Sequence, residues 1–230
     1  MRITVINGQN HKGSSYHIGH ILAEQFSDAK ISEFFLPRDL NHFCLGCYSC
    51  IENEEKCPHY SEKRAIMERI EASDLLIFTT PTYCMRASAP MKAFIDLNFI
   101  NWMAHRPQKC MFSKKAVVIS TAAGAGTKSA MKDITTALFY WGVPYVKTYG
   151  ISVQAACWED VKENKKQKIS SDMVKLASKV KKAKAKAGLK TKGIFSVMRL
   201  MQVKNMGSGE ADRSYWEKQG WLGKGRPWKA

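Results

Sequence analysis

Four of the seven cysteines in this 230-residue chain stand close together, at Cys44, Cys47, Cys50 and Cys57. The spacing C-x2-C-x2-C-x6-C, followed by Pro58, is compact enough for one loop to wrap a cubic [4Fe–4S] cluster. Structural zinc sites more often use two separated C-x2-C pairs. Three interpretations therefore stay open for these cysteines: a [4Fe–4S] cluster, a thiol-lined loop without metal near a subunit contact, or a zinc site.

Disulfides are a weaker explanation for the cysteines. The first residues, MRITVINGQN, reach a turn signal after a short apolar run, and no run of about 18 apolar residues occurs in the chain. We therefore expect a soluble, cytoplasmic protein, in which disulfides rarely persist. Cys110 and Cys157 are expected to be buried small hydrophobic residues rather than ligands.

Short β-branched or apolar runs alternate with helical patterns along the chain. Strands are expected at residues 2–6, 29–37, 74–81, 114–126 and 143–153. Helices are expected at residues 14–26, 61–73, 89–103, 129–142 and 157–188, and the cysteine segment is expected to be a loop. This alternation predicts a parallel sheet with helices on both faces.

Five strands match the flavodoxin-like arrangement, an α/β three-layer sandwich with a parallel sheet in the order 2-1-3-4-5. In such sheets, ligands bind outside the carboxyl ends of the strands, near the point where the strand order reverses. The loops that matter are then those that follow strands one, three and four, at residues 7–15, 80–88 and 121–127.

The first of these loops, NGQNHKGSS at residues 7–15, has the features of a phosphate site. Gly8 and Gly13 allow tight turning, and Ser14 and Ser15 stand at a helix start, where backbone N–H groups and the helix dipole favour an anion. The glycine spacing resembles that of a Walker loop, but Ser14 stands in place of its lysine. A capped helix start without a ligand is the alternative.

The other two loops are suited to a planar ring. In TTPTYCMRASAP, at residues 79–90, Pro81 stiffens the exit from the third strand and Tyr83 supplies an aromatic ring. In STAAGAGT, at residues 120–127, the small residues let the backbone approach a ring closely.

Taken in order, these motifs resemble those of the NADPH-dependent FMN reductase superfamily, and in particular its iron–sulfur flavoprotein branch. The matching residues are Gly8 with Gly13-Ser14-Ser15, the cysteine run Cys44-Leu45-Gly46-Cys47-Tyr48-Ser49-Cys50 with Cys57, Thr80-Pro81-Thr82-Tyr83, and Lys92-Ala93-Phe94-Ile95-Asp96. The resemblance covers about residues 1–155. The chain departs from the family pattern in two places, since Gln9, Asn10 and His11 replace the usual Ser-Pro-Arg and Cys84 replaces a phenylalanine beside the ring.

The resemblance implies FMN at the strand ends, with its phosphate in the first loop and its ring against the other two. The implied cofactor-binding residues are Gln9, His11, Gly13, Ser14, Ser15, Thr80, Pro81, Thr82, Tyr83, Cys84, Thr121, Ala122, Ala123, Gly124 and Gly126. NAD(P)H is the implied electron donor, and a [4Fe–4S] cluster on Cys44, Cys47, Cys50 and Cys57 is the implied relay. Because the flavin carries the chemistry, no side chain is expected to act as a catalytic acid or base.

The last third of the chain forms a basic extension. The net charge of the whole chain is +16. Residues 158–230 hold 19 Lys and Arg against 7 Asp and Glu, whereas residues 1–157 hold 17 against 13. The lysines are not interleaved with stacking aromatic residues, so we interpret them as a solvated helix face and do not expect nucleic-acid binding.

Residues 1–187 are expected to form the FMN-binding domain, and residues 188–230 an arm that packs on another subunit or covers the flavin. Contact between this arm and an anionic membrane surface is the less favoured alternative.

The leading hypothesis is an FMN-dependent NAD(P)H oxidoreductase that forms a homo-oligomer, a dimer or tetramer. The enzyme would pass a hydride from the nicotinamide to FMN, and electrons from FMN to a small-molecule or protein acceptor. The alternatives are an electron carrier of the flavodoxin or iron–sulfur flavoprotein type and a thiol-based redox-sensing interaction protein.

Overall fold

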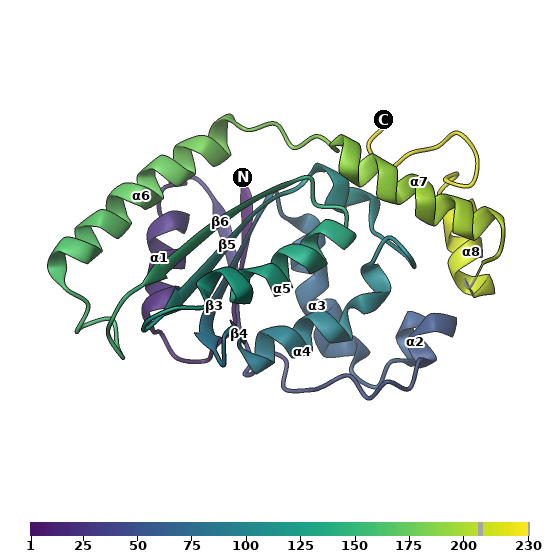
Figure 1. Ribbon diagram of the computed structural model, residues 1–230. Helices are drawn as coiled ribbons and strands as arrows, with labels where there is room; N and C mark the ends of the chain where they lie inside the picture. Colours follow the sequence, from purple (N-terminus) through teal and green to yellow (C-terminus); the bar gives the residue numbers. More distant parts are fainter. Residues whose placement is uncertain (207–208, 230) are drawn as a thin grey trace.

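A parallel sheet organises the computed structural model, which describes residues 1–206 and 209–229 (Figure 1). Its strands are β1 (Arg2–Asn7), β2 (Lys30–Phe35), β3 (Leu75–Tyr83), β5 (Lys115–Ala122) and β6 (Tyr145–Ser152), in the order β2-β1-β3-β5-β6. A short strand, β4 (Arg86–Ala87), pairs antiparallel with the end of β3. The five parallel strands thus confirm the predicted flavodoxin-like order.

Eight α-helices lie in the described part of the chain. They are α1 (Ser14–Ala23), α2 (Ser49–Glu52), α3 (Tyr60–Ala72), α4 (Ala89–Leu97), α5 (Thr127–Tyr140), α6 (Glu163–Lys182), α7 (Leu189–Val203) and α8 (Glu210–Lys218).

Three helices are shorter than predicted: α1, which ends at Ala23 rather than at residue 26, α4 and α6. α4 ends at Leu97 rather than at residue 103, because the Asn98 amide donates a 2.8 Å hydrogen bond back to the Phe94 carbonyl and competes with the helix. α6 ends before the extended Ala183 rather than at residue 188, since the alternating Lys-Ala sequence there has no apolar face at helical spacing.

The three central strands, β1, β3 and β5, are buried on both faces, as their nearly continuous apolar sequences predicted, whereas the edge strands β2 and β6 are partly exposed. Ile3, Leu75 and Val117 point to one face, where α1 and α6 cover them. Ile6, Leu76 and Val118 point to the other face, where α3, α4 and α5 cover them (Figure 1). The sheet therefore holds the loops at its carboxyl edge on a rigid three-layer base.

The C-terminal extension packs on the body of its own chain. Phe195, Trp216 and Trp221 are buried against Met103 and Phe112. Phe112 lies in a 3₁₀ turn (Lys109–Ser113) directly before β5, so this cluster sits at the amino edge of the sheet. Figure 1 shows α7 and α8 together on the side of the molecule away from α1 and α6.

Within residues 1–206 and 209–229, none of the helices combines the length and the apolar character needed to cross a bilayer.

Candidate functional site

A pocket of about 300 Å³ lies at the carboxyl edge of the sheet, where the loop topology predicted it. The loop after β1 and the carboxyl ends of β3 and β5 contribute most of its lining, and the loop after β6 completes it. The lining residues are His11, Gly13, Ser14, Ser15, Pro81, Thr82, Tyr83, Thr121, Ala122, Ala123, Val153, Ala155 and Ala156. We call this the strand-end pocket.

The amino end of α1 faces this pocket. Gly13 caps the helix without a side-chain hydrogen bond, and the first turn carries no acidic residue. The backbone N–H groups of the first turn are therefore not used by a side-chain cap, and the helix dipole is not offset by a carboxylate. This end can hold an anion such as a phosphate.

The start of the first loop is fixed by hydrogen bonds to β3 and to the chain before α4. The N–H of Gly8 donates to the Thr79 carbonyl at 2.7 Å, and the Ser88 hydroxyl donates to the Gly8 carbonyl at 2.6 Å. A Cβ atom at Gly8 would lie 2.7 Å from the Ser88 Oγ and 3.0 Å from the Thr79 oxygen. Gly8 therefore serves close packing of the backbone behind the pocket.

The wall formed by β3 and β4 is a strained hairpin. Cys84 and Met85 connect the two strands with φ angles of 49° and 63°, in the left-handed region that glycine or asparagine usually occupies in such turns. Arg86 holds the hairpin by an ion pair with Asp133 of α5, in which Nε donates to Oδ2 at 3.0 Å. Arg86 and the Ala87 N–H outweigh burial and lower the pKa of Asp133.

Five of the predicted cofactor residues do not line the pocket: Gln9, Thr80, Cys84, Gly124 and Gly126. Thr80 is fully buried, and its Oγ accepts from the Ser88 N–H. Gly126 has a φ of 98°, and a Cβ atom there would lie 2.9 Å from the Met85 sulfur, so it is needed for chain geometry. Sequence reasoning also missed Val153, the last residue of the fifth predicted strand, and Ala155 and Ala156, which follow that strand at the same edge of the sheet.

The four clustered cysteines line a second pocket, of about 340 Å³. Cys50 is buried, Cys57 half-buried, and Cys44 and Cys47 exposed. The other lining side chains are largely apolar and include Leu45, Tyr48, Leu97 and Phe99. Gly46 and Tyr48, with φ angles of 64° and 58°, turn the loop around this space. We call this the cysteine pocket.

The cysteine pocket and the strand-end pocket share no lining residue. The cysteine pocket lies at the carboxyl end of α4, whose nine residues span about 13 Å from the end near β4. In Figure 1, the α2 segment that carries Cys50 is correspondingly remote from β4.

A buried lysine stands behind the cysteine pocket. The ammonium of Lys63, a fully buried residue, donates to Glu54 at 2.8 Å and to the Leu97 carbonyl at 3.3 Å. Burial raises the pKa of the Cys50 thiol, and the Lys63 charge opposes this shift. At the exposed Cys47, a hydrogen bond from the Ser49 backbone N–H lowers the thiol pKa. The surroundings therefore favour the thiolate, the form in which cysteine binds metals, at Cys47, and the neutral thiol at Cys50.

The C-terminal extension supports the cysteine pocket from outside. Asp212 of α8 is 1% exposed and accepts a 2.8 Å hydrogen bond from Arg106. Arg106 in turn donates to the carbonyls of Cys50 and Ile51. This chain of contacts fixes the α2 turn, on which Cys50 lies, to the extension.

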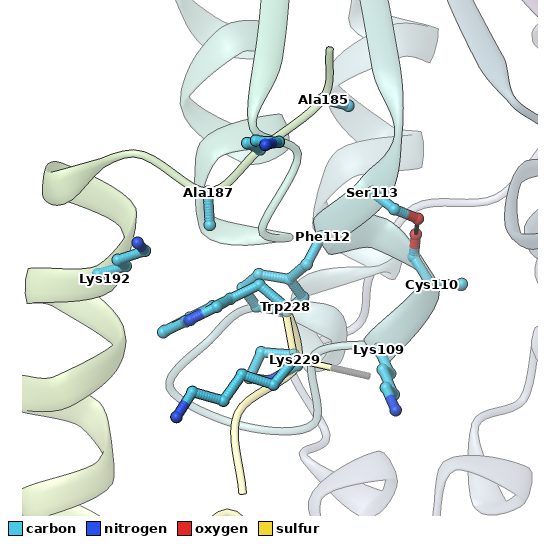
Figure 2. Close-up of a pocket in the computed structure, with 11 residues that line it drawn as sticks. Lys109, Cys110, Phe112, Ser113, Ala185, Ala187, Lys192, Trp228 and Lys229 are labelled. Carbon is cyan, nitrogen blue, oxygen red and sulfur yellow. Dashed lines mark hydrogen bonds between the residues drawn. The ribbon is translucent and has the colours of Figure 1, made fainter.

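A larger pocket, of about 760 Å³, lies elsewhere in the molecule (Figure 2). Lys109, Lys192 and Lys229 lie around Trp228 and Phe112 in this pocket. It is at the amino edge of the sheet and shares no lining residue with the strand-end pocket. In a parallel α/β sheet the ligand site is at the opposite edge, so volume alone does not identify it here.

The family model for NADPH-dependent FMN reductase matches residues 1–157, the part of the chain that builds both the sheet and the strand-end pocket. The chain belongs to this family. Family membership confirms the predicted enzyme class, an NAD(P)H-dependent flavoprotein oxidoreductase with FMN as its cofactor. It also confirms the resemblance that the loop motifs indicated.

Curated relatives of this FMN reductase family member include two iron–sulfur flavoproteins. The chain is 28% identical to the one from Clostridioides difficile (strain 630) over 141 residues, which cover 58% of this chain and 60% of that protein. It is 26% identical to the one from Archaeoglobus fulgidus over 187 residues, 79% of this chain and 80% of that protein.

Solved structures share the fold at low sequence identity. An FMN-dependent NADH-azoreductase from Bacillus anthracis in complex with FMN superposes with a TM-score of 0.58 at 10% identity, over 77% of this chain and all of that one. An NAD(P)H:quinone oxidoreductase from Methanothermobacter marburgensis has a TM-score of 0.58 at 14% identity, over 80% and 98% of the two chains.

The strand-end pocket fits FMN in its donor set and its size. Its uncapped helix terminus offers N–H donors for a phosphate. Pro81 and Thr121, which pair on the neighbouring strands β3 and β5, line a space of the size usual for small-molecule sites.

Proposed function

We propose that the chain is an FMN-dependent NAD(P)H oxidoreductase whose FMN occupies the strand-end pocket. The observation that carries this proposal is the meeting of the three predicted loops at one pocket, beside a helix terminus without cap or acidic residue. Ser14 and Ser15 would hold the phosphate through backbone N–H groups and hydroxyls. Pro81 to Tyr83 and Thr121 to Ala123 would enclose the ring.

When bound, FMN supplies the redox chemistry, since it accepts a hydride from the nicotinamide and gives electrons to a second acceptor. The residues of the chain bind and orient it. The Thr82 and Ser120 hydroxyls form a 3.0 Å hydrogen bond across β3 and β5, which fixes the two sides of the ring site. The Ser152 hydroxyl donates to the Ala123 carbonyl at 2.6 Å and fixes the backbone of the β5 loop.

The acceptor that we propose is a small planar organic molecule, such as a quinone. Tyr83 is 47% exposed, and Ala123 and Ala156 are also exposed, so the mouth of the pocket is open. A flat acceptor can then reach the FMN ring through this mouth, which a docked protein partner would cover. The solved azoreductase and quinone oxidoreductase that share this fold act on molecules of that shape according to their names.

Turnover separates this enzyme from an electron carrier. The FMN-loaded protein is expected to oxidise NADPH or NADH steadily with a quinone or ferricyanide as acceptor. A carrier of the flavodoxin type would bind FMN but show almost no direct turnover. Absence of flavin bands after incubation with FMN would contradict both interpretations.

We further propose that Cys44, Cys47, Cys50 and Cys57 hold a [4Fe–4S] cluster, as the names of the two curated relatives suggest. The four cysteines line one pocket, and their spacing along the chain lets a single loop wrap a cubic cluster. Iron and sulfide analysis after anaerobic purification tests this, and stoichiometric zinc would contradict it.

We also propose that the extension at residues 188–230 is a subunit-packing arm in a dimer or tetramer. The side of α7 away from the body exposes several large apolar side chains: Leu189, Val197, Leu200, Met201 and Val203. Exposed apolar surface of this kind marks interaction sites. Light scattering is expected to give a smaller molar mass for the Val197→Glu variant than for the unchanged chain. A monomeric mass for both proteins would contradict the proposal.

A further inference from the structure

Two histidines and a glutamate converge next to the cysteine pocket. His42 precedes the cysteine segment, whereas His59 and Glu62 follow it, at the start of α3. One nitrogen of each histidine ring and one carboxylate oxygen all lie within 4.8 Å of one another. No other group of three such side chains is this close among residues 1–206 and 209–229.

The distances suit one small metal ion. The Nε2 atom of His42 lies 3.4 Å from the Glu62 Oε1 atom. Two ligands of a tetrahedral zinc ion, with bonds of about 2.1 Å, are also about 3.4 Å apart. The two imidazole rings are stacked, with centroids 4.1 Å apart and planes 10° from parallel. Because an imidazole binds a metal in the plane of its ring, one ring must turn for both to bind the same ion.

The polar atoms of this group are incompletely satisfied by the protein. The Nε2 atom of His59 is buried, and no hydrogen-bond partner for it is present in the described part of the chain. A buried polar atom without a partner destabilises the fold. A metal ion held by His42, His59 and Glu62 would give this buried nitrogen a partner.

We propose that His42, His59 and Glu62 bind one divalent first-row transition-metal ion of the zinc class, separate from the metal on the cysteines. Two imidazoles and a carboxylate are a ligand set for such ions and leave a fourth position for water. Because His42 and His59 flank all four cysteines, the ion joins the two ends of the cysteine segment. It thereby clamps the loop that forms the cysteine pocket.

Cobalt(II) is the probe, because its visible spectrum distinguishes nitrogen and oxygen ligands from thiolates. The first preparation is a full-length fourfold variant that lacks the thiolates of the cysteine pocket. It carries Cys44→Ser, Cys47→Ser, Cys50→Ser and Cys57→Ser. Wild-type protein with alkylated cysteines is the second preparation, in case the fourfold variant does not fold. Both are titrated with Co²⁺ alone, followed by displacement with Zn²⁺.

We expect one equivalent of Co²⁺ per chain, with a tetrahedral spectrum that lacks thiolate charge-transfer bands. His42→Gln and Glu62→Gln should each weaken binding at least about tenfold. The matched control is His20→Gln, because His20 also faces a carboxylate, that of Glu33 at 3.5 Å, but lies in α1 away from the triad. The Co²⁺ affinity of the His20→Gln variant should equal that of the same preparation without this substitution.

Limited proteolysis tests the clamp itself. Bound Zn²⁺ should slow cleavage between residues 42 and 59 in both preparations, and His42→Gln should abolish that protection. The proposal is overturned if neither preparation binds Co²⁺, or if His42→Gln and Glu62→Gln bind it as tightly as His20→Gln does. The proposal does not depend on FMN, since neither preparation needs the cofactor to be present.

Discussion

The strand-end pocket and the cysteine pocket are similar in size, about 300 and 340 Å³, but the chain builds them in opposite ways. The first is made of small residues and backbone at the ends of strands that the core holds. The second is made of side chains on one long loop, in which Gly46 and Tyr48 adopt left-handed conformations. Backbone donors suit a phosphate and a flat ring, whereas thiols on a loop suit a metal centre.

The difference shows what each site depends on. The strand-end pocket inherits its geometry from the sheet, through contacts such as that of the Gly8 N–H with the Thr79 carbonyl. The cysteine pocket depends on contacts from far along the chain, such as the one through Arg106 to Asp212 of α8. We therefore expect the two pockets to respond independently to substitution. Four experiments test this independence and the contacts that hold the strand-end pocket, from the largest expected effect to the smallest.

The largest expected effect is the loss of the cluster from Cys47→Ala. This removes one of four ligands from an exposed position, so the fold should persist. Iron content after anaerobic purification should fall from about four atoms per chain to nearly none, because a [4Fe–4S] cluster is held by four thiolates. FMN affinity should not change, and a parallel loss of FMN would show that the pockets are coupled.

Ser14→Asp should weaken FMN binding at least about 100-fold, because it places a carboxylate against the proposed phosphate position. The same carboxylate at a helix amino end stabilises the cofactor-free fold slightly. The matched control is Ser61→Asp in the first turn of α3, which does not line the strand-end pocket. Fluorescence titration measures both, and equal affinities would contradict the assignment of the phosphate site.

Gly8→Ala should reduce the free energy of unfolding by about 1–3 kcal/mol, because the added methyl group meets the Ser88 hydroxyl and the Thr79 carbonyl. Gly124→Ala is the contrasting substitution, since no atom lies within 4 Å of a Cβ there. Its cofactor-free stability should be unchanged or slightly higher. Urea denaturation distinguishes them, and equal stabilities would show that the backbone behind the pocket is not tightly packed.

Asp133→Asn should destabilise the protein by about 1 kcal/mol at pH 7, because it removes the charged partner of the exposed Arg86. The pKa of Asp133 is lowered in the folded protein. Its contribution is therefore present above the ordinary carboxyl pKa of about 3.9 and is lost as the pH falls through the lower, folded-state value. Denaturation at pH 7 and near pH 3 should show the difference shrinking, and a constant difference would contradict this ion-pair account.

Much of the fold and part of the candidate site follow from the sequence by simple rules. Apolar strands alternating with helical patterns predicted the sheet, and the sheet order predicted which loops meet. Ser14, Pro81 and Thr121 were found in this way, and the structure brings them to one pocket. The same rule applied to the loop after β6 would have found Ala155.

Other features depend on side-chain contacts that no local pattern encodes. Thr80 was predicted at the pocket, but its hydroxyl turns inward and accepts from the N–H of Ser88, on the far side of the β3–β4 hairpin. The hairpin at Cys84 contains no glycine or asparagine that would have predicted it. The Arg86–Asp133 ion pair holds this turn in a conformation that its own residues disfavour. His42 and His59 became neighbours only because the cysteine loop closes on itself.

The most direct test of the central claim is an NMR titration of the cofactor-free protein with FMN and, separately, with riboflavin. FMN should shift the amide signals of Gly13, Ser14 and Ser15 strongly, since their N–H groups would meet the phosphate. Riboflavin, which has the same ring but no phosphate, should shift those of Thr82 and Ala123 while leaving the α1 amides nearly unchanged. The account is contradicted if FMN and riboflavin shift the α1 amides alike, or if FMN shifts only the residues around Cys50 or Trp228.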